Sequence, residues 1–129
     1  NARGPFLVSR EALPYLRKRR GRIVNMGSLG GVRPWATHVH YCSSKAAVHM
    51  LTKSMAKALA PGVAVNAVAP GVIDLGETSA AAFMKRMAKQ TPMRRNGTGS
   101  DIAAAVMFFA TGPSFITGQV LVVDGGMGL

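Results

Sequence analysis

A tyrosine and a lysine stand four residues apart in the segment YCSSK, which runs from Tyr41 to Lys45. If the segment is helical, four residues amount to slightly more than one turn, so the two side chains project from the same face. An ammonium group beside a phenol favours the phenolate and makes the phenolic proton easier to transfer near neutral pH. The pair could therefore work as a general acid or base.

A serine and a proline–glycine loop each follow a short apolar segment. Ser28 comes after RIVNM, and Pro70 and Gly71 come after VAVNAVA. Both segments are rich in β-branched residues and are predicted to be neighbouring parallel strands, whose carboxyl ends form the ligand-binding edge of an open α/β sheet. Hydride added to a carbonyl carbon leaves negative charge on the oxygen. A hydroxyl of Ser28 could meet that charge and Tyr41 could then supply a proton, so the pattern suggests carbonyl reduction.

The Tyr-x-x-x-Lys spacing is weak evidence when taken alone, because an exposed tyrosine and lysine on a solvated helix produce the same pattern. Its weight comes from the conjunction with Ser28 at the end of one strand and NAVAPG at the end of the next.

The elements that must position these residues follow the order strand, loop, helix, strand. We expect a helix over 5–18 that Pro14 kinks or divides, a strand over 22–26, a glycine-rich loop, a helix over 41–59 and a strand over 63–69. The helix over 41–59 is assigned from one face that holds Ala46, Ala47, Met50, Leu51, Ser54, Met55 and Ala58. This unit predicts a right-handed parallel crossover.

The second half of the chain completes an α/β pattern. The segment GVIDLGETS is expected to form a loop that could act as a lid, followed by a helix over about 80–89. Thr98 and Asp101 are predicted to form a capping box for a helix over 101–110, and QVLVVD to form the last strand. The predicted fold class is therefore α/β, a doubly wound, Rossmann-like parallel sheet of about three strands with flanking helices.

With several separated motifs in order, the sequence resembles the short-chain dehydrogenase/reductase family from NARGPF to VVDGG. The resemblance implies that Ser28, Tyr41 and Lys45 are the catalytic set and that Asn1 supports a proton relay behind the lysine. It implies an NAD(P)-dependent oxidoreductase acting on a carbonyl or a secondary alcohol, with NADP slightly favoured over NAD. The stretches KALAPGVAVNAVAPG and FITGQVLVVDGG are similar to those of pteridine reductases and 3-oxoacyl carrier-protein reductases, and they do not separate the two.

The resemblance also implies a cofactor site. Lys45, beside Tyr41, would hold the nicotinamide ribose hydroxyls, and a backbone loop would meet the nicotinamide carboxamide. This loop comprises Pro70, Gly71, Val72 and Ile73.

Two departures from the family pattern bear on that site. Leu75 follows Asp74 where members often have threonine, so that contact is lost or Thr78 replaces it. The glycine-rich phosphate turn G-x-G-x-x-G does not occur in the sequence. We therefore expect residues 1–129 to be a single partial domain, the carboxyl-terminal, catalytic half of a Rossmann-like oxidoreductase without its first dinucleotide-binding half.

Composition limits the other possibilities. The 129 residues are 48% hydrophobic, enough for one ordinary core, and their apolar runs fall short of the roughly 20 residues of a membrane span. With one cysteine, Cys42, and no visible secretion signal, a cytoplasmic protein is expected. The net charge of +11 and the cluster RKRRGR are interpreted as a solvated helix end that suits the helix dipole, rather than as a site for nucleic acid or a membrane.

The remaining candidate residues have ordinary interpretations. The histidines His38, His40 and His49 are expected on the surface rather than at a metal site, because they lack carboxylates or further cysteines at ligand spacing. Cys42 is interpreted as a small core residue, whereas Trp35 could either border a substrate or only pack.

The expected partners are a small carbonyl substrate and further copies of the chain, as a dimer or tetramer. The alternative to an enzyme is a non-catalytic, truncated fragment that acts as an assembly module, for which the unpaired edge of RIVNM would favour capture of a partner. Binding to nucleic acid is the third hypothesis and ranks last.

Overall fold

The computed structural model of this chain describes residues 1–76 and 81–129. Its helices are α1 (Arg3–Lys18), the short 3₁₀ helix η1 (Leu29–Gly31), α2 (Val39–Leu59), α3 (Ala81–Gln90) and α4 (Gly99–Thr111). Its strands are β1 (Arg22–Met26), β2 (Ala64–Pro70), β3 (Ile73–Asp74), β4 (Gly97–Thr98) and β5 (Val120–Val123). The boundaries agree with the sequence-based expectations to within a few residues.

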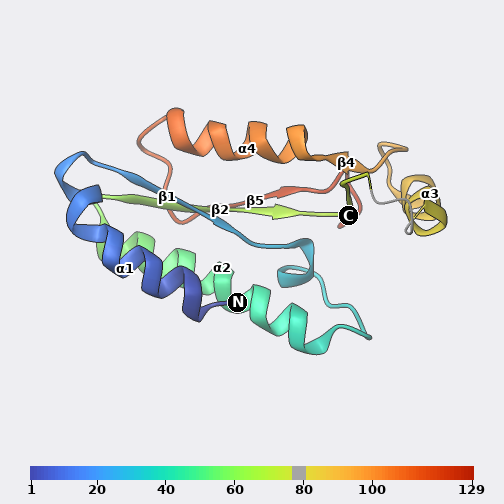
Figure 1. Ribbon diagram of the computed structural model, residues 1–129, viewed down its shortest axis with the longest axis horizontal. Coiled ribbons are helices and arrows are strands. Elements are labelled where there is room, and N and C mark those ends of the chain that lie inside the picture. The colour runs from blue at the N-terminus through green and yellow to red at the C-terminus, as the bar shows by residue number, and fades with distance from the viewer. Residues whose placement is uncertain (77–80) are drawn as a thin grey trace.

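A three-stranded parallel sheet in the order β1-β2-β5 forms the centre of the molecule. Helices cover both of its faces, with α4 on one side and α1 and α2 on the other (Figure 1). This arrangement confirms the predicted α/β class with a parallel sheet and flanking helices. The pairing of β1 with β2 across α2 also confirms that the two strands of the expected crossover unit are parallel.

The central strand β2 is the most buried element, because its side chains alternate between two apolar layers. Val65 packs with Met55 and Ala56 of α2 on one face. Val68 packs with Phe109 of α4 on the other face. Burial on both sides explains why the whole VAVNAVA segment is rich in small and β-branched residues.

Helix α1 runs unbroken through Pro14, so of the two expected effects, a kink or a division, the division is wrong. Proline removes one backbone donor, but the rest of the ladder can persist when packing holds the helix in place. Leu13 and Leu16 supply that packing, since both lie against the apolar cluster on the α2 side of the sheet.

The predicted apolar face of α2 is largely exposed to solvent. Ala46, Ala47, Met50, Ser54 and Ala58 are exposed, and of the predicted set only Met55 is fully buried. The side that meets the sheet instead carries Val48, His49, Thr52, Met55 and Ala56. Periodicity selects the wrong face here because two polar residues, His49 and Thr52, find hydrogen-bond partners inside and can be buried.

A short parallel pair, β3 with β4, was not expected from the sequence. It joins the segment after β2 to the start of α4, where the predicted capping box is confirmed by reciprocal hydrogen bonds between Thr98 and Asp101. The predicted lid segment is only partly described, and Thr78 lies outside the described residues. In the described ranges, no helix combines the length and apolar character that crossing a bilayer would require.

Candidate active site

The register of the central sheet places Ser28 level with Pro70. Met26, the last residue of β1, pairs with Val68 of β2. Two residues further along each segment lie Ser28 and Pro70. The amide of Gly27 extends the ladder by donating to the Val68 carbonyl at 2.7 Å. The residues predicted at the two strand ends are therefore brought together at the carboxyl edge of the sheet.

Gly30 is the point at which the Ser28 hydroxyl and the Tyr41 ring converge. A Cβ atom at Gly30 would lie 3.3 Å from Tyr41 Cε1 and 3.5 Å from Ser28 Oγ. The absence of a side chain at this position lets the helix α2 approach the loop after β1 closely. As a result, the buried Ser28 side chain and the half-buried Tyr41 ring both lie next to Gly30.

Lys45 joins this group from the next turn of α2. Its Nζ donates to the carbonyl of Met26 at 3.0 Å and lies 5.9 Å from the centre of the Tyr41 ring. The side chain thus ties the helix to the end of β1 and places a positive charge beside the phenol. This geometry agrees with the same-face pairing expected from the YCSSK spacing.

Ser28 is oriented by three hydrogen bonds, two within its own loop and one to helix α2. Its Oγ accepts from the amide of Gly30 at 3.1 Å, and its carbonyl accepts from the amide of Gly31 at 2.9 Å. The Ser28 amide donates to Nε2 of His49 at 3.3 Å. Because a lone pair of Oγ is already occupied by Gly30, the hydroxyl proton is available to donate to another group.

Asn1 contacts the first turns of α2. Its Nδ2 donates to Oγ of Ser44 at 2.8 Å, and that hydroxyl donates to the carbonyl of Tyr41 at 2.7 Å. The structure therefore places Asn1 beside the helix segment that carries Tyr41 and Lys45, through Ser44 rather than through a contact with the lysine ammonium.

The loop from Pro70 to Ile73 lies at the same edge of the sheet and is held on both sides. The amide of Gly71 donates to the Val123 carbonyl at 3.0 Å, and the Val72 carbonyl accepts from the amide of Gly97 at 3.0 Å. A Cβ atom at Gly71 would lie 2.6 Å from Cβ of Asp124, so glycine is needed for this close approach.

Trp35 stacks on Tyr41, with ring centres 6.1 Å apart and planes 10° from parallel. Of the two roles left open for this residue, packing against the candidate catalytic residue is therefore observed. Stacking limits the directions in which the phenol can turn.

His49 is a site residue that the sequence did not reveal. It was expected on the surface, but its side chain is buried on the sheet side of α2 and contacts the loop that carries Ser28. The expectation fails because a histidine can be buried when its ring finds a hydrogen-bond partner inside the protein, here the Ser28 amide. The available signal was the glycine at each end of GSLGG, although glycine is also common in any loop.

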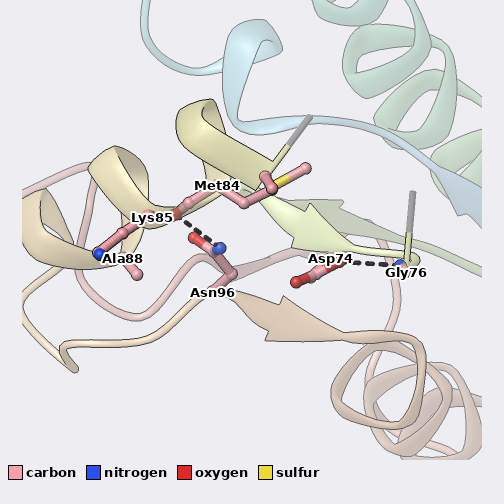
Figure 2. Close-up of a pocket in the computed structure, with 7 residues that line it drawn as sticks. Asp74, Gly76, Met84, Lys85, Ala88 and Asn96 are labelled. Carbon is pink, nitrogen blue, oxygen red and sulfur yellow. Dashed lines mark hydrogen bonds between the residues drawn. The ribbon is translucent and has the colours of Figure 1, made fainter. Parts of the chain in front are cut away.

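A separate cavity of about 380 Å³ lies between β3 and α3 (Figure 2). Asp74, Lys85 and Asn96 line it, and the predicted catalytic residues do not. Its polar contacts are local, such as the bond from Asn96 Nδ2 to the Met84 carbonyl at 2.9 Å. We therefore do not assign the chemistry to this cavity.

The fold and the site together define a Rossmann-like α/β protein with a serine, a tyrosine and a lysine gathered at the carboxyl edge of its parallel sheet. A family model described as enoyl-(acyl carrier protein) reductase matches residues 1–128. The chain belongs to the short-chain dehydrogenase/reductase family, which confirms the resemblance seen in the sequence.

Curated relatives and solved structures agree with this assignment. The chain is 40% identical to 3-oxoacyl-[acyl-carrier-protein] reductase FabG of Aquifex aeolicus, over 98% of this chain and 53% of that protein. It is 39% identical to inactive 2-(S)-hydroxypropyl-CoM dehydrogenase 2 of Xanthobacter autotrophicus, over 98% of this chain and 60% of that protein. It superposes with a TM-score of 0.86 and 33% identity on gluconate 5-dehydrogenase of Burkholderia cenocepacia in complex with NADP and tartrate, covering 96% of this chain and 51% of that one. The chain thus spans between half and three fifths of the length of these proteins.

Proposed function

We propose that this chain carries the catalytic half of an NAD(P)-dependent oxidoreductase that interconverts a carbonyl and a secondary alcohol. The observation that carries the proposal is the convergence of Ser28 Oγ and the Tyr41 ring on Gly30, with the Lys45 ammonium beside them. A hydroxyl donor, a proton source and a positive charge at one point are what a carbonyl oxygen needs as it gains negative charge.

In this proposal Ser28 and Tyr41 act directly on the substrate oxygen. The Ser28 hydroxyl donates to the carbonyl oxygen, because its lone pair is held by the Gly30 amide and its proton is free. Tyr41 transfers its proton to the same oxygen in reduction and removes it in oxidation.

Lys45 and Asn1 support the proton transfer. The Lys45 ammonium favours the phenolate form of Tyr41 through its charge, and its bond to the Met26 carbonyl holds it in place. Asn1 lies beside the same part of α2 through Ser44 and is assigned to the proton relay behind the lysine.

The donor set at the sheet edge fits a nicotinamide cofactor. Lys45 Nζ and the Tyr41 hydroxyl suit ribose hydroxyls, and the backbone from Pro70 to Ile73 suits a carboxamide, which needs both a donor and an acceptor. The bound cofactor would supply or accept hydride. NADP is slightly favoured over NAD, supported by the gluconate 5-dehydrogenase neighbour, which is solved with NADP.

The substrate is proposed as a small molecule with a ketone or a secondary alcohol. The relatives named as a 3-oxoacyl carrier-protein reductase and a gluconate 5-dehydrogenase support this chemical class. The test is turnover by the complete natural polypeptide, followed through reduced nicotinamide, with 3-oxoacyl thioesters and simple ketones as substrates. Lack of turnover across the panel with both NADPH and NADH, despite cofactor binding, would contradict the proposal.

The domain assignment is tested by mass. We infer that residues 1–129 are one half of a Rossmann-like domain, because they cover about half the length of several relatives. We expect the natural polypeptide to have a denatured mass of about twice 13.5 kDa, because it would also contain the other mononucleotide-binding half. A mass of 13.5 kDa would instead favour the assembly module, which should associate without binding nicotinamide.

We also propose that the protein is cytoplasmic and forms dimers or tetramers of its own chain. The exposed face of α2 supports self-association, because Met50 is 61% exposed among the small residues Ala46, Ala47, Ser54 and Ala58. A single cysteine supports the reducing compartment. Native mass spectrometry of the complete polypeptide tests the oligomer.

A further inference from the structure

The side chain of His49 projects from helix α2 and fits closely against both ends of the Ser28 loop, Gly27 to Gly31. Its side chain is only 7% exposed. On one side a Cβ atom at Gly27 would overlap Nε2 of the ring, and on the other a Cβ atom at Gly31 would lie 2.6 Å from Cε1. Two glycines that bracket Ser28 in the sequence are thus the walls of the imidazole site.

The ring contacts that loop at both ends and is hydrogen-bonded to Ser28. The Ser28 amide donates to Nε2 at 3.3 Å, which requires Nε2 to be unprotonated. In the neutral ring the proton therefore sits on Nδ1, which lies on the side of the ring toward Gly31. The neutral ring consequently bridges the first and last residues of the segment from Ser28 to Gly31.

We propose that His49 is a positioning residue that holds the Ser28 hydroxyl in its reactive place, and that only the neutral imidazole does so. This inference rests on the proposed carbonyl chemistry, in which Ser28 orients the substrate oxygen. Protonated Nε2 would be a second donor facing the Ser28 amide, so the contact would turn from attractive to repulsive. Ser28 would then lose one of its three hydrogen bonds, and its hydroxyl would move relative to Tyr41.

The surroundings of His49 favour the neutral ring. Burial lowers the pKa of His49, and the charges of Lys45 and Lys53 on the same helix lower it further, whereas the backbone of Gly31 raises it. The neighbouring elements η1 and β5 present Gly31, Val32, Val120 and Val122 to the adjoining cavity, and none of these side chains titrates.

The pH dependence follows from these directions. Because the folded pKa of His49 is lowered below 6.5, the neutral ring and the Ser28 contact predominate above about pH 6.5. They are lost as the pH falls through the lowered pKa. Turnover should therefore decline on the acid side for a reason that lies outside the Ser28, Tyr41 and Lys45 set.

Two substitutions separate the effect of losing the hydrogen-bond acceptor at position 49 from the effect of losing the titratable group. His49→Gln keeps an oxygen acceptor for the Ser28 amide but cannot be protonated in this range, whereas His49→Leu removes the acceptor and keeps comparable bulk. His40→Gln on the same helix removes an exposed imidazole and serves as the matched control. We expect His49→Leu to lower kcat/KM by about tenfold to a hundredfold at neutral pH, the range expected for a misplaced reacting group. His49→Gln should retain most activity and lose the acid decline, and His40→Gln should keep the wild-type profile.

The experiment uses the complete natural polypeptide and adds nitrogen NMR of the His49 ring. A neutral ring protonated on Nδ1, together with a flattened acid limb in His49→Gln, would support the proposal. A ring protonated on Nε2 at neutral pH, or identical pH profiles of wild type and His49→Gln, would overturn it. If the wild type binds NADPH and has the Nδ1 tautomer but reduces none of the carbonyls, the proposed function fails. In that case the catalytic role of His49 is also refuted, but its predicted tautomer is not. A failure of the proposed function can thus be distinguished from a failure of the His49 proposal alone.

Discussion

Ser28, Tyr41 and Lys45 come within reach of one another through two backbone features, the open position at Gly30 and the last carbonyl of β1. In the proposed reaction these side chains supply the chemistry, but their spacing depends on these small backbone contacts. At the residue scale, the strongest predictions therefore concern single atoms rather than the loss of whole side chains.

Tyr41→Phe in the complete polypeptide removes only the phenolic hydroxyl and keeps the ring that stacks on Trp35. We expect kcat to fall by at least about a hundredfold, because general acid–base catalysis contributes at least this much. Cofactor affinity should change little. Steady-state kinetics and nicotinamide fluorescence titration measure the two effects, and Tyr15→Phe at an exposed tyrosine is the control. Retained turnover would refute the role assigned to Tyr41.

Elements are joined in this molecule by buried polar contacts as well as by apolar packing. Asn25 of β1 donates from Nδ2 to Thr52 Oγ1 of α2 at 2.9 Å, and that hydroxyl donates to the Val48 carbonyl. The contact links the strand that ends at Ser28 to the helix that carries Tyr41 and Lys45.

Thr52→Val should destabilise the protein, because the near-isosteric change leaves the buried Asn25 amide without its acceptor. The expected loss is about 1–3 kcal/mol of the free energy of unfolding. Thr52→Ser keeps the hydroxyl and should cost less. Urea denaturation of the complete polypeptide measures both, and a Thr52→Val variant as stable as the wild type would contradict the importance of this hydrogen bond.

The start of α4 offers a second test at the scale of the element. Thr98→Ala removes the side-chain acceptor of the capping box and should lower stability by about 1 kcal/mol. Ser100→Ala, an exposed change in the same first turn, is the matched control. Thermal unfolding gives the melting temperature of each variant. Equal melting temperatures of the two variants would contradict the importance of the cap.

Asp101 adds a pH dependence to the same cap. Its pKa is held well below the ordinary carboxyl range, first by the side chain of Arg95 and then by Thr98. Because the folded pKa is lowered, this contribution to stability is present above about pH 4 and is lost as the pH falls through the folded pKa. In Asp101→Asn the melting temperature should therefore depend less on pH in the acid range than in the wild type, and parallel curves would speak against this origin.

At the scale of the whole molecule, the described sheet ends at β1 on one side and at β5 on the other. The outer edge of β1 carries unpaired backbone groups among the described residues, and such edges recruit further strands. If residues 1–129 are expressed alone, we expect concentration-dependent association and no saturable binding of NADPH. Light scattering and calorimetry check this, and a monomer that binds NADPH would show that these residues suffice for the cofactor.

The sequence by itself determined the order and type of the principal elements, the parallel α/β class, the cap of α4 and the grouping of Ser28, Tyr41 and Lys45. These follow from local patterns, since strand runs, glycine-rich loops and the spacing within one helical turn need no distant contact to be read. Only the tertiary structure decided that α1 passes through Pro14, that α2 turns its polar residues Thr52 and His49 toward the sheet, and that β3 pairs with β4. The physical reason is that each outcome depends on partners remote in the chain, such as Asn25 for Thr52 and the Gly27–Gly31 loop for His49, which hydrophobic periodicity does not register.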